Sequence, residues 1–230
     1  MMRGHAVRYA GWQIWDRTGP RLLASWLIIG FVCLPLHFAV QHSAPPPQVL
    51  AQMAHTLHSQ FGWITAIVLF HGIVAEDRTR GFFRFYLAKP VSAMWYYGQS
   101  HVLAVLALAT WSAGFIVMFS LAVRPDWNWG LVPNGLALGL LLGGLLFFFS
   151  TITARDWMAM LAVVLAAALL RARWPRQGSS LGKVIDAALP PSHLLGQTLT
   201  AGQWAWLVGW SLGLFMLGLL VLWRRPLGEG

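Results

Sequence analysis

The stretch LVPNGLALGLLLGGLLFFFSTI, residues 131–152, decides the kind of fold that this chain adopts. It contains no Asp, Glu, Lys or Arg, and leucine, phenylalanine and glycine make up most of it. A helix that crosses the roughly 30 Å hydrocarbon core of a bilayer needs about 20 predominantly apolar residues. The stretch has that length and composition, so it predicts a membrane-spanning helix.

Five further stretches extend this pattern along the chain. Residues 22–40, 102–123 and 204–223 are long, apolar and free of charged residues. The apolar parts of 57–75 and 157–170 are shorter, and the second needs flanking arginines that reach the membrane surfaces, namely Arg155, Arg171 and Arg173. The sequence therefore predicts an all-α membrane protein, a bundle of six transmembrane helices that forms a single domain over residues 1–230.

The composition of the whole chain agrees with a membrane-embedded fold. Of its 230 residues, 57% are hydrophobic and 10% are charged, whereas soluble domains average about 45–50% and about 25%. These values exclude both a soluble domain with a charged shell and a disordered chain. Cys33 is the only cysteine and lies in an apolar run, which excludes a disulfide framework and a thiolate metal site.

The excess of basic over acidic residues is best explained by the topology of the chain in the membrane. A net charge of +9 is compatible with a nucleic-acid partner, but the basic residues form short clusters between apolar runs, as they do in the cytoplasmic loops of membrane proteins. We therefore predict the lipid bilayer as a partner and no nucleic acid. With six spans and a cytoplasmic N-terminus, eleven of the 16 basic residues lie inside. This bias predicts a plasma membrane protein, in bacteria an inner membrane protein, with both termini in the cytoplasm.

One cluster of basic residues disagrees with the six-span topology. In a six-span topology one loop with four basic residues lies on the outer side of the membrane. These residues are Arg171, Arg173, Arg176 and Lys183. If 157–170 were re-entrant and did not cross, thirteen basic residues would lie inside and three outside. The charge count alone favours this five-span alternative, so the crossing of 157–170 and the side of the 171–183 loop stay open.

The segment before the first span, residues 1–21, mixes aromatic and basic side chains. Trp12 and Trp15 lie between Arg8 and Arg17, and the segment ends at Gly19-Pro20. An amphipathic stretch of this kind next to a span is typical of a helix that lies in the membrane interface. We expect such a helix on the cytoplasmic side.

The loop after the second span, residues 76–99, concentrates charge. Six of the chain's charged residues fall between Glu76 and Lys89, among the aromatic residues that follow Gly81. Their spacing predicts a short helix that ends before Pro90, because proline disfavours helix at the residue before it. Such a helix is too short and too polar to span, so it either rests on lipid or docks to a soluble partner.

This loop resembles the coupling helix in permease subunits of type-2 ATP-binding-cassette exporters. The likeness is carried by an acidic pair, a basic residue, a glycine, a hydrophobic-basic run and a Lys-Pro step. The matching positions, together with the other basic and aromatic residues of the run, are Glu76, Asp77, Arg78, Arg80, Gly81, Phe82, Phe83, Arg84, Leu87, Lys89 and Pro90. The resemblance implies that these residues dock in a cleft of an ATPase subunit.

Other parts of the chain are similar to the same family. A connecting helix corresponds to residues 9–16, a short inner turn to 150–156, and a proline element before the last span to 189–191. The resemblance implies a permease with no catalytic residues and no cofactor of its own, which exports or flips an unidentified substrate. Its partners would be two ATPase subunits carrying Mg-ATP and a second permease copy or a homologous permease.

Small residues recur at helical spacing in two of the predicted spans. Helix backbones approach closely in lipid where small residues are four positions apart. This spacing predicts packing contacts within the subunit, with a dimer face as the alternative, at Gly135, Gly139, Gly143, Gly209 and Gly213.

Two alternative functions use other residues. His55 and His58, with i,i+3 spacing near the first outer loop, would serve a metal-dependent membrane enzyme, although no acidic residue accompanies them. A non-transporting anchor would use loop 76–99 only to tether a soluble partner. The nearest match to a phosphate-binding loop, 178–184, lacks the required spacing and the hydroxyl residue after its lysine, so we predict no ATPase activity in this chain.

Overall fold

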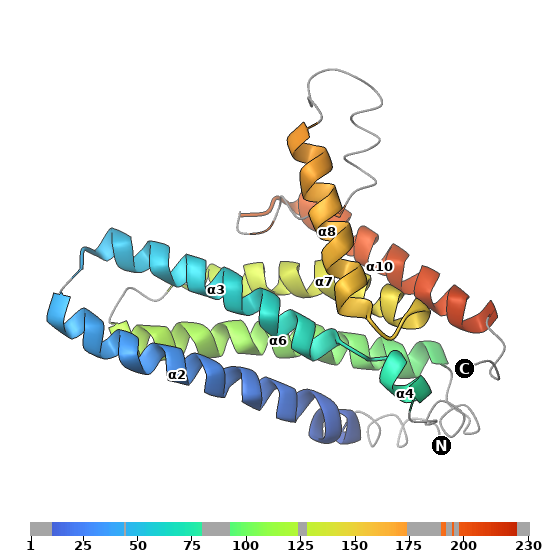
Figure 1. Cartoon of the computed structure of the whole chain (residues 1–230), viewed down its shortest axis with the longest axis horizontal. Coiled ribbons are helices and arrows are strands. Elements are labelled where there is room, and N and C mark those ends of the chain that lie inside the picture. The colour runs from blue at the N-terminus through green and yellow to red at the C-terminus, as the bar shows by residue number, and fades with distance from the viewer. Residues whose placement is uncertain are drawn as a thin grey trace. The chain divides into compact units, whose positions relative to one another are not determined.

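A computed structural model describes residues 11–43, 45–79, 93–123, 128–173, 190–191, 195 and 198–224. All regular structure in these residues is helical, which confirms the predicted all-α class for them (Figure 1). After a π-helical turn, η1 (Ile14–Thr18), the helices are α2 (Gly19–Ser43), α3 (Pro47–Phe70), α4 (Ala75–Thr79), α6 (Ala93–Val123), α7 (Leu131–Ile152), α8 (Asp156–Arg173) and α10 (Ala201–Arg224).

Five helical stretches of the described chain are long and apolar enough to cross a membrane. They are Gly11–Ser43, Pro47–Asp77, Met94–Val123, Leu131–Ile152 and Ala201–Arg224. Each overlaps a predicted span. Large apolar side chains on these helices are exposed, among them Phe31 at 78% and Leu121 at 69%. An exposed apolar surface of this extent is typical of a protein that faces lipid.

The sixth predicted span, 157–170, is helical but does not belong to this group. It lies within α8, whose 18 residues include Asp156, Arg171 and Arg173. At 1.5 Å per residue α8 is about 27 Å long, slightly less than the hydrocarbon core. Charge at both ends and limited length therefore separate α8 from the five other long helices.

Helix α3 begins ten residues earlier than its predicted span. The predicted span 57–75 adds one turn, from Leu57, to an apolar run that starts at Phe61, but the helix starts at Pro47 and ends at Phe70. Proline is well suited to the first turn of a helix because its missing N–H has no intrahelical partner there. The chain between the first two spans is therefore mostly helix.

The first long helix continues through the glycine-proline step that was expected to end the interfacial segment. The stretch Gly11–Ser43 is helical throughout, with the π-helical turn η1 just before Pro20. The Gly19 N–H donates to the Ile14 carbonyl, and a Cβ at Gly19 would lie 2.7 Å from that oxygen. The π-turn therefore requires glycine there and lets the helix pass a proline without a break.

The described chain divides into two compact units, which are considered separately. Unit 1 comprises Met1–Leu69 and Gly98–Gly139, and unit 2 comprises Phe70–Tyr97 and Leu140–Gly230. In unit 1, α2, α3 and most of α6 lie alongside one another (Figure 1). At one end Nη1 of Arg21 donates to the Leu69 carbonyl at 3.4 Å, which satisfies an acceptor in the last turn of α3.

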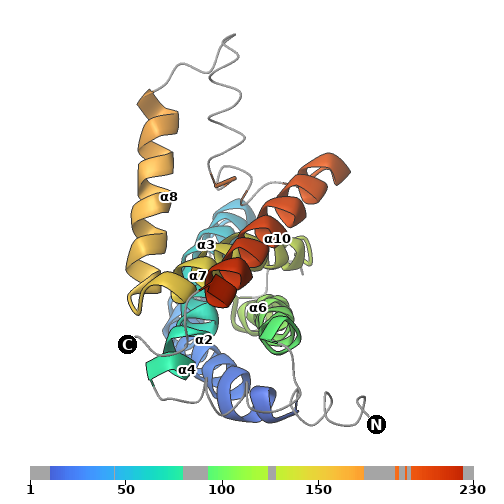
Figure 2. The ribbon, with the colours of Figure 1, turned by 90° about the vertical axis from the view of Figure 1, so that its right-hand side faces the viewer.

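Unit 2 is centred on Phe147 of α7. Its ring lies 4.4 Å from that of Phe215 and 6.1 Å from that of Tyr97, measured between centroids. α8 runs in a different direction from α7 and α10, as Figures 1 and 2 both show. Between Asp156 and Arg171 only Asp156, Met160 and Ala167 are buried. α8 is nevertheless fastened at its far end, because Nη1 of Arg171 donates to the Pro190 carbonyl at 2.6 Å.

The predicted packing glycines have different surroundings. Gly135 and Gly139 of α7 lie against Ser112 and Leu108 of α6, and Gly143 is buried. Around Gly209 and Gly213 of α10 no atom of the described chain lies within 4 Å of an added Cβ, so the packing expected there is not seen within this chain. α10 instead approaches α7 closely where Gly144 meets Ser211 and where Gly218 meets Phe147.

These surroundings predict opposite effects for two matched substitutions. Gly135→Ala places a methyl group against the Ser112 hydroxyl and should destabilise the protein by about 1–3 kcal/mol, the usual cost of overpacking. Gly209→Ala meets open space and should leave stability unchanged or slightly raised, since alanine favours helix. Thermal denaturation of both variants in one detergent or lipid gives the comparison. Equal effects would contradict the close approach at Gly135.

Candidate functional site

The predicted coupling residues fall only partly within the structure. Glu76, Asp77 and Arg78 belong to α4, whose bounds are Ala75–Thr79. Asp77 is completely buried and Glu76 partly so. The remaining predicted residues lie outside the described part of the chain, namely Arg80, Gly81, Phe82, Phe83, Arg84, Leu87, Lys89 and Pro90. The structure therefore describes where the predicted coupling loop starts.

A sharp turn connects α3 to α4. Gly72 has a φ of +72°, the left-handed conformation in which glycine commonly ends a helix. A Cβ there would also lie 2.7 Å from Cγ of Glu76. The Glu76 N–H donates to the Gly72 carbonyl at 2.9 Å and begins α4, while Ile73 and Val74 are buried. The turn therefore requires glycine at position 72 for two reasons: its backbone conformation, and the Glu76 side chain that occupies the space of a Cβ.

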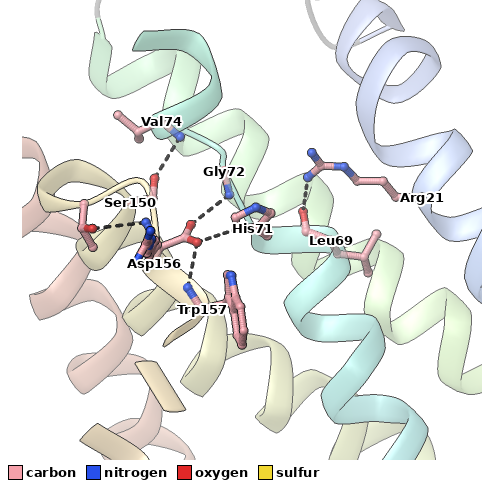
Figure 3. Close-up of polar contacts among 10 residues, drawn as sticks. Arg21, Leu69, His71, Gly72, Val74, Ser150, Asp156 and Trp157 are labelled. Atoms are coloured by element: carbon pink, nitrogen blue, oxygen red, sulfur yellow. Dashed lines mark hydrogen bonds and ion pairs between the residues drawn. The ribbon is translucent and has the colours of Figure 1, made fainter. Parts of the chain in front are cut away.

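The carboxylate of Asp156 binds this turn from the start of α8. Oδ1 accepts a hydrogen bond from Nδ1 of His71 at 2.5 Å, and Oδ2 accepts the Gly72 N–H at 2.9 Å (Figure 3). Oδ1 also lies 2.7 Å from the Trp157 N–H, which donates to it. Asp156 is fully buried, and the His71 side chain is 38% exposed. These donors offset the large cost of removing a carboxylate from water.

A second side chain, at the end of α7, binds the same turn two residues further along the chain. The Ser150 hydroxyl, at the end of α7, accepts the Val74 N–H at 2.9 Å (Figure 3). Gly72 and Val74 follow the end of α3, where backbone N–H groups no longer have regular helical partners. Ser150 at the end of α7 and Asp156 at the start of α8 supply those partners. We call the group formed by His71, Gly72, Val74, Ser150 and Asp156 the Asp156 junction.

Short-range hydrogen bonds between α7 and α8 fix the position of Asp156. The Thr153 N–H donates to the Phe149 carbonyl at 2.8 Å, which closes the last turn of α7, and the Arg155 N–H donates to the Thr153 hydroxyl at 3.1 Å. α8 then starts immediately with Asp156 in its first turn. A negative charge at this position is favoured by the partial positive charge of the helix N-terminus. The short link therefore fixes the direction of the carboxylate.

The geometry of the Asp156 junction suits mechanical attachment. The described residues contain no group of three or more His, Cys, Asp or Glu that would hold a metal ion. The polar atoms of the junction bind one another and two backbone amides of a turn 84 and 76 residues away. Their arrangement joins the end of α3 to the start of α8 at the point where the predicted coupling loop begins.

The histidines of the metal-enzyme alternative are separated by their surroundings. His55 is exposed, whereas His58 is 4% exposed and its Nε2 lies 3.0 Å from the Ser112 hydroxyl. His37, another histidine of this end, hydrogen-bonds the Ala122 carbonyl through Nδ1. His55 and His58 thus differ in burial and partners, so this alternative gains no support from the described geometry.

The residues that form the Asp156 junction were not predicted as a site. The sequence identified 150–156 as a short turn and showed that His71 lies near the end of a span. An aspartate in the first turn after an apolar helix is a recognisable signal for a helix start. No local signal, however, indicates that its carboxylate binds an amide 84 residues away.

Comparisons with known proteins give no match that would identify the chain. No known protein family matches the sequence, and no curated protein matches it. The functional argument therefore rests on the chain's own residues and their arrangement.

The Asp156 junction predicts which backbone amides each side chain protects. Asp156→Ala removes the acceptor of Gly72 and His71 and should cost about 1–3 kcal/mol, the usual penalty for unpaired buried donors. Amide-resolved hydrogen exchange should then be faster at Gly72 and nearly unchanged at Val74. Ser150→Ala should show the reverse pattern. If either variant accelerated both amides equally, the two contacts would not be separate.

Proposed function

We propose that this chain is the transmembrane subunit of an ATP-driven transporter of the ATP-binding-cassette class, similar to type-2 exporter permeases. The observation that carries the proposal is the Asp156 junction. It bonds the turn just before the predicted coupling loop to the end of α7 and the start of α8. Six charged residues concentrated between Glu76 and Lys89 give a docking partner its contacts. A subunit that is moved by an external ATPase needs a docking loop whose start is firmly attached to the membrane helices. The hydrogen-bonded turn before the charged loop 76–99 provides such an attachment.

In this proposal the energy comes from partner subunits. Two ATPase subunits carry Mg-ATP, and their closure and opening push on loop 76–99. Because Asp156 and Ser150 bind the turn at Gly72 and Val74, displacement of that turn reaches α3, α7 and α8 together. This chain catalyses no covalent step. Scarcity of charge within the apolar stretches agrees with an external energy source, since ion-coupled carriers use intramembrane charges.

The proposed topology has six spans in the plasma membrane, with α8 as the fifth of them and an interfacial helix before the first. Residues 157–170 contain no charge, and Asp156 and Arg171 at their ends are both held by hydrogen bonds. Six spans leave both termini in the cytoplasm and form half of a pathway. A second permease copy, identical or homologous, completes it around a substrate that is exported or flipped.

Docking through the loop is tested by charge reversal. The double variant Arg80→Glu, Arg84→Glu should lose the ATPase that co-purifies with the wild-type chain, because its basic contacts become repulsive. The matched control, Arg176→Glu with Lys183→Glu, changes the same charge in another loop and should retain the ATPase. Quantitative co-purification from membranes measures both. Retention by the first variant would refute the docking assignment, and absence of any ATPase from wild type would refute the proposed function.

The span count is tested by the positions of the two ends. Six spans put residues before Gly11 and residues after Arg224 on the same side, whereas five put them on opposite sides. Cysteines introduced at residues 5 and 228 in a Cys33→Ala background can be labelled with a membrane-impermeant maleimide in sealed inner-membrane vesicles of known orientation. Equal labelling of the two positions supports six spans. Labelling of one position alone supports five.

A further inference from the structure

A buried polar pair connects two long helices of unit 1, away from the Asp156 junction. Nε2 of His58 in α3 and Oγ of Ser112 in α6 lie 3.0 Å apart. His58 is 4% exposed and Ser112 is completely buried. His58 lies eleven residues after Pro47 and twelve before Phe70, in the middle of α3. The proposed function assigns this pair no role.

Close packing surrounds the pair on every described side. The His58 ring has its centroid 5.4 Å from the rings of both Trp111 and Phe115 of α6. Gly135 of α7 faces the Ser112 hydroxymethyl group so closely that a Cβ there would collide with it. One turn after His58, a Cβ at Gly62 would lie 3.0 Å from Leu138. The hydrogen bond is therefore formed at a seam where three helices meet.

Ser112 differs from three other hydroxyl residues in the helices. Ser25, Ser43 and Thr110 each donate to the carbonyl four residues earlier in their own helix, at 2.8–2.9 Å. Ser112 pairs with the neighbouring helix instead. The carbonyl of Leu108, four residues before Ser112, gives its hydroxyl an alternative acceptor of the same kind. The contact between α3 and α6 can thus be exchanged for one within α6 without an orphaned hydroxyl.

A hydrogen bond fixes the register of two helices more sharply than apolar packing does. Its strength falls steeply once donor and acceptor separate beyond about 3.5 Å, whereas apolar side chains slide and repack at small cost. Within a span, polar residues that pair across helices are commonly functional. His58 belongs to the helix that continues directly into His71 and the Asp156 junction.

We propose that the His58–Ser112 hydrogen bond is a register lock that holds α3 in one position against α6 and opens when α3 moves, with Ser112 then donating to the Leu108 carbonyl. The use of this lock in transport rests on the proposed function, since α3 carries the displacement of the coupling loop. The existence of the lock itself does not depend on the proposed function. The two statements are therefore tested by different measurements.

The experiment uses the full chain in lipid nanodiscs and three variants. Ser112→Ala leaves His58 without its partner and should lower the melting temperature. His58→Phe combined with Ser112→Ala replaces both partners by apolar groups and should restore most of that loss. His58→Phe alone completes the cycle. Gly209→Ala serves as a control at a site with open space in the same chain.

Hydrogen exchange in residues 71–79 then distinguishes a lock from simple packing. In the restored double variant a lock predicts exchange about threefold faster in this segment, the factor that corresponds to one hydrogen bond between membrane helices. Unchanged exchange in a stable double variant would overturn the lock. An unchanged melting temperature in Ser112→Ala would overturn the hydrogen bond itself.

A second measurement tests the use of the lock. In complex with the ATPase that co-purifies with wild type, the double variant should show basal ATP hydrolysis raised about threefold, because α3 no longer resists displacement. A wild-type rate in that variant would refute a role in coupling. If wild type binds no ATPase but exchange in 71–79 still accelerates in the double variant, the proposed function fails and the lock stands.

Discussion

The hydrocarbon of a bilayer offers no partners to backbone N–H and C=O groups, and the whole structure follows from that constraint. Inside the apolar stretches the helices satisfy these groups themselves. At breaks between helices the groups become unpaired, and several polar side chains of the described residues supply partners there. Arg21 binds a carbonyl at the end of α3, while Asp156 and Ser150 bind amides just after it.

The distribution of hydrophobic residues was sufficient to predict most of the helices. The predicted span 131–152 coincides with α7, because both of its ends are set by sharp changes in polarity. α3 was predicted less well. Its first turns contain Gln52 and His55, which are exposed, so the helix starts well before its apolar run does. Hydropathy detects what a helix buries in lipid, and it does not detect helical turns that carry polar residues.

The candidate site was less predictable than the helices. The acidic pair Glu76 and Asp77 was identified from its place in a charged loop, but the burial of Asp77 was not expected. His58 was considered as a metal ligand near the first outer loop, at the start of the predicted span 57–75, whereas the structure buries it within α3 with Ser112 as its partner. The His58–Ser112 contact joins residues 54 positions apart in sequence. Such contacts are set by the packing of helices, which local composition does not encode.

The hydrogen bond from Arg171 to the Pro190 carbonyl has a consequence for how the chain tolerates change. It joins the end of α8 to a residue 19 positions later, so these two points of the chain are held together whatever number of residues lies between them. The entropy needed to close a loop grows only slowly with its length. Residues inserted between these two anchors should therefore add little to the entropy cost of holding them together.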